Sequence, residues 1–279
     1  MQYFKFVRFV FLVFSIVPHL IVANISIVSW NIKDFGQSRN DAEITAIAQH
    51  IRHADVLAIQ EVVAIHPGGA KAVARLADQL NRMGAKWDYM VSEPTQSTSS
   101  HRSERYAFLW KTSKLTVTGG GSRLLSELSP NVEREPYFIQ FKSQNKVLTV
   151  INYHACTHKP DYPERGEINA ISRWLMNKNY DNVIWAGDMN LNRKDIAFQN
   201  IIADGYTSVL DDEKTSLKMT CDDGDYLSKG EDNVLHKLSN LRFISCRVLD
   251  FMDGRDCNLV SEMRDSYSDH LPVEVELEL

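Results

Sequence analysis

The sequence predicts an α/β fold, a layered α/β sandwich built from mixed β-sheets. Short hydrophobic runs recur along the chain and are separated by Gly, Pro, Asn and Asp, a pattern typical of buried strands. Segments with apolar residues at helical spacing lie between some of these runs, and the later part of the chain is richer in strands. With 279 residues and 44% hydrophobic composition, the chain can bury the core of one large domain.

Six hydrophobic runs predict strands. Five are apolar enough to be buried, namely Ile25–Trp30, Asp55–Val62, Tyr106–Trp110, Lys146–His154 and Asn182–Asp188. The sixth, Glu274–Leu279, alternates with period two and is expected to be half-exposed. Helical spacing predicts helices over Asp41–His53, Ala70–Met83 and Arg165–Asn177. Two polar segments are expected to be loops, Glu93–Glu104 and Asp211–Gly230.

The N-terminus predicts export. Lys5 and Arg8 precede an apolar run, Phe9–Val17, that is too short for a confident membrane span. We interpret residues 1–23 as a signal peptide and residues 24–279 as the mature catalytic domain, in a secreted or periplasmic protein. A retained N-terminal anchor is the alternative.

The four cysteines fit an exported protein. An even cysteine count favours at least one disulfide, with three connectivities open for two bridges among Cys156, Cys221, Cys246 and Cys257. Four free thiols are the alternative. The net charge of −5 provides no global basic field, so a polyanionic partner would have to be bound by a local basic patch.

Polar residues capable of chemistry gather at the predicted strand ends. Asn31, Glu61 and His154 each come at or just after the end of such a run, as do Asp188 and Asn190. Asp269 and His270 precede the last strand, and ligands in α/β folds bind where such ends converge. Taken singly, each is equally well explained as a turn residue, a cap or a core histidine.

Together these residue types favour metal-assisted hydrolysis of a phosphoester. Several carboxylates suit a hard cation such as Mg²⁺, with Ca²⁺ or Mn²⁺ as alternatives. Two histidines oriented by carboxylates suit proton transfer near neutral pH. The sequence has no nucleophile elbow and no P-loop, so a covalent nucleophile is not indicated.

The motifs SWNIKDFG, LAIQEV, NYHA, WAGDMN and SDHLPVEV, in this order, resemble those of the endonuclease/exonuclease/phosphatase superfamily. The stretches NIKDFG, YMVSEP, ERYAFLW and REP are most similar to the deoxyribonuclease I branch. The resemblance spans the mature chain. It implies a four-layer α/β sandwich, with two packed mixed β-sheets flanked by helices, and a divalent-metal-dependent phosphodiesterase.

The resemblance also implies residue roles. Glu61 would be the main metal carboxylate, with Asn31, Asp188 and Asp269 completing the metal and water network. His154 and His270 would be the acid/base pair.

Carboxylates would orient both histidines in the resembling enzymes. Glu104 of the ERY motif would orient one, and Asp232, at the start of a late strand, would orient the other. Asp188, Asn190 and Arg134 would line the scissile phosphate.

Several further residues are expected to contact DNA. Asn31, Lys33, Arg102 and Arg105 are candidates for phosphate contacts. Val63 and Arg102 replace an arginine and an aromatic residue that the resembling nucleases use in the DNA minor groove. Arg102 retains a charge suited to that groove, whereas Val63 does not. We expect Arg39 and Arg193 to be solvated surface charges.

The sequence therefore predicts a Mg²⁺-dependent endonuclease of low sequence specificity. Its expected partner is double-stranded DNA, its products carry 5′-phosphate and 3′-hydroxyl ends, and it is expected to be a monomer with no stable membrane association after signal removal. The main alternative is a related phosphodiesterase or phosphatase acting on a phospholipid or inositol phosphate. A DNA-repair endonuclease and a non-catalytic binding module are weaker alternatives.

Overall fold

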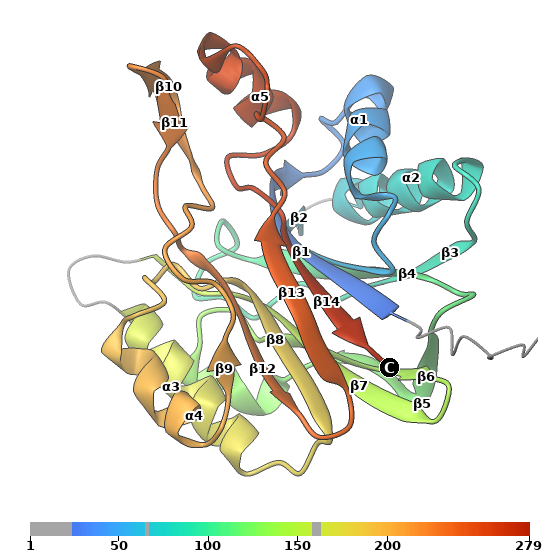
Figure 1. Cartoon of the computed structure of the whole chain (residues 1–279), viewed down its shortest axis with the longest axis vertical. Helices are drawn as coiled ribbons and strands as arrows, with labels where there is room; N and C mark the ends of the chain where they lie inside the picture. The colour runs from blue at the N-terminus through green and yellow to red at the C-terminus, as the bar shows by residue number, and fades with distance from the viewer. Residues whose placement is uncertain (1–23, 65–66, 158–162) are drawn as a thin grey trace, which may run out of the picture.

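Two mixed six-stranded sheets form the centre of the molecule, as the computed structural model shows (Figure 1). The structure describes residues 24–64, 67–157 and 163–279, so the predicted signal peptide lies outside the described residues. The strand orders are β13-β14-β1-β2-β4-β3 and β5-β6-β7-β8-β12-β9. β1 pairs with β2, and β7 with β8, in parallel, whereas the neighbouring pairs are antiparallel.

The first sheet contains β1 (Asn24–Phe35), β2 (Val56–Val63), β3 (Trp87–Val91), β4 (Glu104–Lys111), β13 (Arg242–Val248) and β14 (Val273–Glu278). The second contains β5 (Thr116–Leu124), β6 (Tyr137–Ser143), β7 (Lys146–His154), β8 (Asn182–Asp188), β9 (Thr207–Ser208) and β12 (Asp232–Leu238). A separate hairpin is formed by β10 (Leu217–Asp222) and β11 (Asp225–Leu227). The α-helices are α1 (Asp41–Ile51), α2 (Gly68–Arg82), α3 (Pro163–Met176), α4 (Gln199–Ala203) and α5 (Val260–Ser266).

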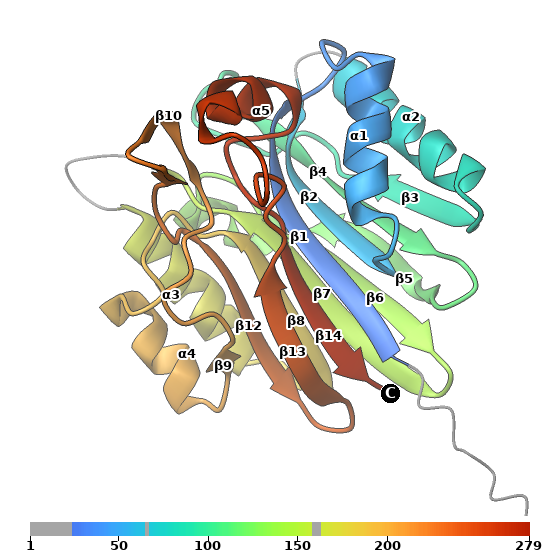
Figure 2. The same ribbon diagram turned by 45° about the horizontal axis from the view of Figure 1, so that its top comes forward.

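Three hydrophobic clusters separate four layers. Side chains such as Val56, Phe108 and Ile184 fill the space between the two sheets. A second cluster packs α1 and α2 on the first sheet, and a third packs α3 and α4 on the second. Figure 2 shows the helices on the two outer faces of the sheet pair. The predicted four-layer α/β sandwich is confirmed.

The predicted elements agree with the structure where an apolar run ends at a sharp polar boundary. β7 and β8 have the predicted bounds. α1 begins one residue after Asn40, because the Asn40 side chain accepts from the Glu43 backbone and the Glu43 side chain accepts from the Asn40 backbone, forming a capping box. β1 continues past Trp30 to Phe35, so Asn31 lies within the strand.

The expectation of a half-exposed last strand fails at Glu274, and the expectation of a loop over Asp211–Gly230 is wrong. β14 is an interior strand, and its Glu274 is only 5% exposed because His53 and Arg247 pair with the carboxylate at 2.9 and 2.6 Å. The segment Asp211–Gly230, expected to be a loop, contains the β10–β11 hairpin. Elsewhere in β14 the alternation holds, since Val275 and Leu277 are buried while Glu276 and Glu278 are partly exposed.

A disulfide joins Cys221 of β10 to Cys257, which begins a short 3₁₀-helix before α5. The expectation of at least one disulfide is confirmed, while Cys156 and Cys246 are free thiols. No helix in the described part of the chain has the length and apolar character needed to cross a membrane.

His50 gives the fold a defined pH response. The ring of His50 in α1 lies 6.0 Å from Trp30 and 5.9 Å from Phe251, and Nε2 is 3.2 Å from the Leu249 carbonyl oxygen. Burial lowers the pKa of His50 below its ordinary value, although the Leu249 carbonyl opposes the shift. The folded state therefore favours the neutral ring.

The stability that His50 contributes should be lost on acidification. Below the ordinary histidine pKa of about 6.5, the unfolded chain binds a proton that the folded chain resists, so unfolding becomes easier. The free energy of unfolding of the wild type, measured with urea, should therefore approach that of His50→Gln as pH falls from 8 to 5. A difference between the two proteins that stays constant over this range would contradict the argument.

Candidate active site

The register of β8 with its two neighbours builds the centre of the candidate site. Asp188 ends β8 opposite His154 of β7 and opposite Asp232 of β12. β8 thus places one buried carboxylate between side chains from both neighbouring strands.

Gly187 permits the close contact between β7 and β8. Its φ is +148°, and a Cβ at this position would lie 1.7 Å from the Tyr153 carbonyl oxygen. No side chain fits there without moving the two strands apart. Gly187 therefore keeps His154 opposite Asp188.

Two histidine–carboxylate pairs face Asp188. His154 Nδ1 is 2.9 Å from Glu104 Oε2, and His270 Nδ1 is 2.8 Å from Asp232 Oδ2. The Nε2 atoms lie 3.6 and 3.5 Å, respectively, from the same oxygen, Asp188 Oδ2. Each imidazole is therefore oriented by one carboxylate and presents its other nitrogen towards the shared one.

The carboxylates dominate the protonation of both rings. Burial lowers the pKa of His270, but Asp232 and Asp188 outweigh it and hold that pKa well above the ordinary value. Burial likewise lowers the pKa of His154, and Glu104 outweighs it to give a raised pKa. The carboxylates therefore stabilise the protonated form of each ring relative to a histidine in water.

The three carboxylates respond differently to their surroundings. Burial raises the pKa of Asp188 and of Glu104, but the histidines outweigh it, so both pKa values lie below the ordinary range. The pKa of Asp232 is raised, because burial and the nearby Asp188 outweigh the attraction of His270. Asp188 and Glu104 are thus the carboxylates that favour the ionised form.

Asn190 forms a tight turn directly after Asp188. It has φ +50°, and its backbone N–H donates to Asp188 Oδ1 at 3.0 Å. Its side-chain amide donates to the Ala155 carbonyl at 2.9 Å. The ordinary turn chemistry of an Asp-x-Asn sequence therefore also fixes the Asp188 carboxylate.

Asn31 and Glu61 offer oxygen ligands beside this centre. Asn31 Nδ2 donates to Glu61 Oε1 and to Asp188 Oδ2, both at 3.0 Å. Among the described residues, Asn31 Oδ1 is buried without a hydrogen-bond partner, and such an orphaned oxygen is costly unless a ligand satisfies it. Amide and carboxylate oxygens, which Asn31 and Glu61 supply, are ligands that a hard divalent cation takes.

A second group of side chains has the spacing of metal ligands, but hydrogen bonds between its members account for that spacing. Oxygens or nitrogens of Asp188, Asp232 and His270 lie within 4.8 Å of one another, close enough to hold a metal ion. Because His270 Nδ1 already bonds Asp232, we interpret this set as a proton-transfer group. Asp269 is in neither set, and its carboxylate accepts from Arg264 at 3.2 Å.

Arg134 is used mainly inside the site. Its Nε donates to the Arg102 carbonyl at 3.0 Å and lies 3.3 Å from Glu104 Oε2. Its Nη1 donates to the Ala155 carbonyl at 3.2 Å. Arg134 thus braces the Glu104–His154 pair, while also lining a cavity of about 270 Å³ next to Glu61.

The other predicted DNA contacts lie in different places. Arg102 lines the Glu61 cavity and is 40% exposed, with Nη1 3.8 Å from Glu133. Arg105 does not line this cavity, because its guanidinium donates to the Ser92 carbonyl at 2.6 Å. His101 and Asp34, which our sequence analysis missed, also line the cavity. Asp34 lies near the end of β1 and His101 in a loop, and neither position gave a periodic signal that could have singled it out.

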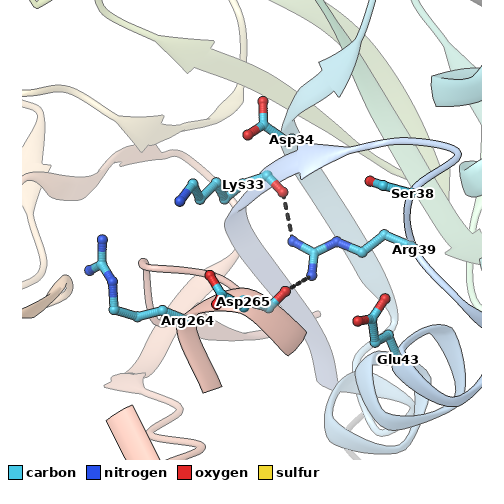
Figure 3. Close-up of a pocket in the computed structure, with 7 residues that line it drawn as sticks. All are labelled: Lys33, Asp34, Ser38, Arg39, Glu43, Arg264 and Asp265. Carbon is cyan, nitrogen blue, oxygen red and sulfur yellow. Dashed lines mark hydrogen bonds between the residues drawn. The ribbon is translucent and has the colours of Figure 1, made fainter. Parts of the chain in front are cut away.

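A second cavity, of about 230 Å³, lies beside the end of β1 (Figure 3). Lys33 and Arg39 line it, and the Arg39 guanidinium bridges the Lys33 and Asp265 carbonyls. Arg193 similarly donates to the Asp211, Glu213 and Asp232 carbonyls. The expectation that Arg39 and Arg193 are solvated is wrong, since both are 6% exposed and hold loops together through backbone oxygens.

Comparison with known proteins gives a family and two curated relatives. A model described as "Endonuclease/Exonuclease/phosphatase family" matches residues 28–270. A deoxyribonuclease of Thioalkalivibrio sp. is 30% identical over 66% of this chain, and the match covers about half, 51%, of that relative's length. Deoxyribonuclease-1-like 1 of Cricetulus griseus is 25% identical over 83% of this chain and 76% of that protein.

Solved structures share the fold at low identity. TDP2 of D. rerio, complexed with a single strand DNA product, has a TM-score of 0.62 and 14% identity, covering 92% of this chain and all of that one. A mannosyl-6-phosphatase of Bacteroides thetaiotaomicron has a TM-score of 0.60 and 15% identity, covering 91% and 99%. These similarities concern the fold.

If Glu61 and Asn31 hold a divalent cation, the cation should stabilise the folded protein. At about ten times its dissociation constant, Mn²⁺ or Mg²⁺ should add about 1.4 kcal/mol to the free energy of unfolding. Glu61→Gln should remove most of this gain. Glu93→Gln, at a side chain that is 88% exposed, is the control and should keep it. Equal stabilisation of Glu61→Gln and the wild type would place the cation elsewhere.

Proposed function

The chain belongs to the endonuclease/exonuclease/phosphatase family, and from this premise we propose that it is a divalent-metal-dependent endonuclease. Its proposed reaction is hydrolysis of phosphodiester bonds in double-stranded DNA, with little sequence specificity and with 5′-phosphate and 3′-hydroxyl products. The observation that carries the proposal is the pair of carboxylate-oriented histidines facing Asp188, next to Asn31 and Glu61. The two curated relatives named as deoxyribonucleases support DNA as the substrate.

Asn31 and Glu61 would hold the cation, which we propose to be Mg²⁺, with Ca²⁺ or Mn²⁺ as alternatives. When bound, the cation supplies Lewis-acid stabilisation of charge on the phosphate. Asp188 accepts a hydrogen bond from Asn31 and faces the Nε2 atoms of both histidines. Its negative charge would therefore stabilise the bound cation and the protonated form of either histidine. Asp269 would act through the surrounding water, because Arg264 holds its carboxylate.

The two histidine pairs would perform the proton transfers. One pair, with its imidazole neutral, takes a proton from the attacking water, and the other, with its imidazole protonated, gives a proton to the leaving 3′ oxygen. Glu104 and Asp232 keep each Nδ1 engaged, so each Nε2 is the nitrogen that exchanges the proton. The Asn190 amide and Arg134 would orient and neutralise the non-bridging phosphate oxygens.

Basic side chains near the site would bind the DNA backbone despite the negative net charge of the protein. Lys33 lines the cavity at the end of β1, and Arg102 lines the cavity at Glu61. The two cavities share Asp34 in their linings, so they adjoin each other. Lys33 and Arg102 would therefore contact phosphates on both sides of the scissile bond. We propose a secreted or periplasmic monomer that carries residues 1–23 as its signal peptide.

Val63 favours a second candidate function. It lines the Glu61 cavity and presents an apolar side chain where the resembling nucleases carry an arginine. A phosphodiesterase or phosphatase acting on a phospholipid or inositol phosphate would retain the same hydrolytic centre. The substrate assay below distinguishes the two.

Nicking of supercoiled plasmid tests the proposal. Wild-type protein with Mg²⁺ should nick the plasmid, and a chelator should abolish nicking. Asp188→Ala should be inactive, because both histidines and Asn31 lose their shared partner. Asp181→Ala, at an exposed turn, is the matched control and should be active. No nicking by folded wild type, with Mn²⁺ and Ca²⁺ also supplied, would favour the second candidate function.

Removal of either histidine should slow turnover far more than it weakens binding. His154→Ala and His270→Ala should each lower kcat by about 10²- to 10⁴-fold, the usual scale for a lost acid or base. His53→Ala, at a side chain that is 41% exposed, is the control and should have a wild-type rate. Near-normal rates for both site variants would show that the acid/base roles are wrongly assigned.

A further inference from the structure

A short segment within Asp211–Gly230, the region expected to be a loop, pairs with the backbone around His270. Ser216 and His270 form an antiparallel bridge. The Leu217 N–H donates to the Asp269 carbonyl at 2.8 Å, and the Leu271 N–H donates to the Thr215 carbonyl at 2.7 Å. The segment Thr215–Leu217 therefore fixes the backbone on both sides of His270.

The first residue of this segment also contacts the partner of His270. The backbone N–H of Asp232 donates to Thr215 Oγ1 at 3.2 Å, and the Thr215 hydroxyl opposes the rise in the pKa of the Asp232 carboxylate. Thr215 is fully buried, so water cannot replace these contacts. One residue thus touches both sides of the Asp232–His270 pair.

The opposite side of the Asp232 backbone is fixed independently. Arg193 Nη1 donates to the Asp232 carbonyl at 3.1 Å. A Cβ at Gly230 would lie 2.9 Å from Arg193 Nη2, so the guanidinium packs directly against the chain that leads into β12. Because the backbone is held from both sides, the Asp232 carboxylate has little freedom to relax if one contact is altered.

We propose that Thr215 is a positioning residue that sets the geometry of the Asp232–His270 hydrogen bond. Its carbonyl holds the chain at His270, and its hydroxyl holds Asp232, so the 2.8 Å contact between Oδ2 and Nδ1 depends on it. This inference rests on the proposed function only in the catalytic role given to His270.

The segment should stay in place when the hydroxyl alone is removed. The disulfide Cys221–Cys257 ties β10 to the start of the α5 region, and Arg264 donates to the Leu217 carbonyl. Ser216 Oγ also exchanges hydrogen bonds with the Lys229 backbone. Figure 1 shows the β10–β11 hairpin standing beside α5. A Thr215 side-chain variant therefore changes the Asp232 contact with the backbone pairing intact.

Steady-state kinetics on plasmid DNA test the proposal. Thr215→Val should lower kcat by about 10- to 100-fold with little change in KM, the usual scale for a lost partner of an active-site ligand. Thr215→Ser, which keeps the hydroxyl, should restore the rate. Thr220→Val, the same change at an exposed threonine of β10, should have a wild-type kcat. In a His270→Ala background, Thr215→Val should add no further loss.

A spectroscopic measurement separates this inference from the proposed function. In protein labelled with ¹⁵N in histidine, the Nδ1 proton of His270 should give a hydrogen-bonded resonance, assigned by its loss in His270→Ala. Thr215→Val should shift or broaden this resonance, and Thr215→Ser should restore it. If Thr215→Val does not fold, Thr215→Ala replaces it in comparison with Thr215→Ser.

Each combination of results is decisive. An inactive wild type with a shifted Thr215→Val resonance would overturn the proposed function and support the positioning role. An active wild type, with unchanged kcat and an unchanged resonance in Thr215→Val, would overturn the positioning role alone. A loss in Thr215→Ser with a wild-type kcat in Thr215→Val would show that packing of the methyl group, and not the hydroxyl, is what matters, and would overturn the positioning role.

Discussion

The register at the C-terminal end of β8 is the constraint on which the site depends. Parallel pairing with β7 and antiparallel pairing with β12 set His154 and Asp232 on either side of Asp188. A slip of one residue would turn these side chains to the opposite face of the sheet. The hydrophobic layers on both faces of the sheet oppose such a slip, because it would exchange Ile184 and Trp185 between the two layers and disrupt the packing of both. The core thus specifies the chemistry through the strand register.

Burial of so many charges is tolerated because each has a defined partner. Asp188, Glu104 and Asp232 are almost fully buried, yet each contacts a histidine. The two imidazoles, with raised pKa values, offset the carboxylates in a region where water is largely excluded. Two buried oxygens of the site, Asn31 Oδ1 and Glu104 Oε1, have no hydrogen-bond partner among the described residues. A cation beside Asn31 and Glu61 would satisfy the first of them.

The sequence predicted what local patterns determine. Continuous apolar runs ended by polar turns predicted β7 and β8 to the residue, and the order of motifs implied the four layers. It also placed Asp232 at the head of a strand. The hairpin after Asp211, the pairing of Thr215 and the burial of Arg39 and Arg193 were missed. These features depend on carbonyl acceptors and a disulfide partner supplied by distant segments, and neither periodicity nor composition encodes such partners.

Gly187 has a consequence at the level of the gene. The space that a Cβ would need is already occupied by the Tyr153 carbonyl, so the requirement at this position is for the absence of an atom. An absence cannot be restored by altering a neighbouring side chain, because the obstruction is backbone. Among all codons that mutation could place there, only those for glycine preserve the spacing of His154 and Asp188. Mutations that accumulate in this gene must therefore leave glycine at position 187. An apolar residue elsewhere in the strand has a side chain that another apolar residue can replace.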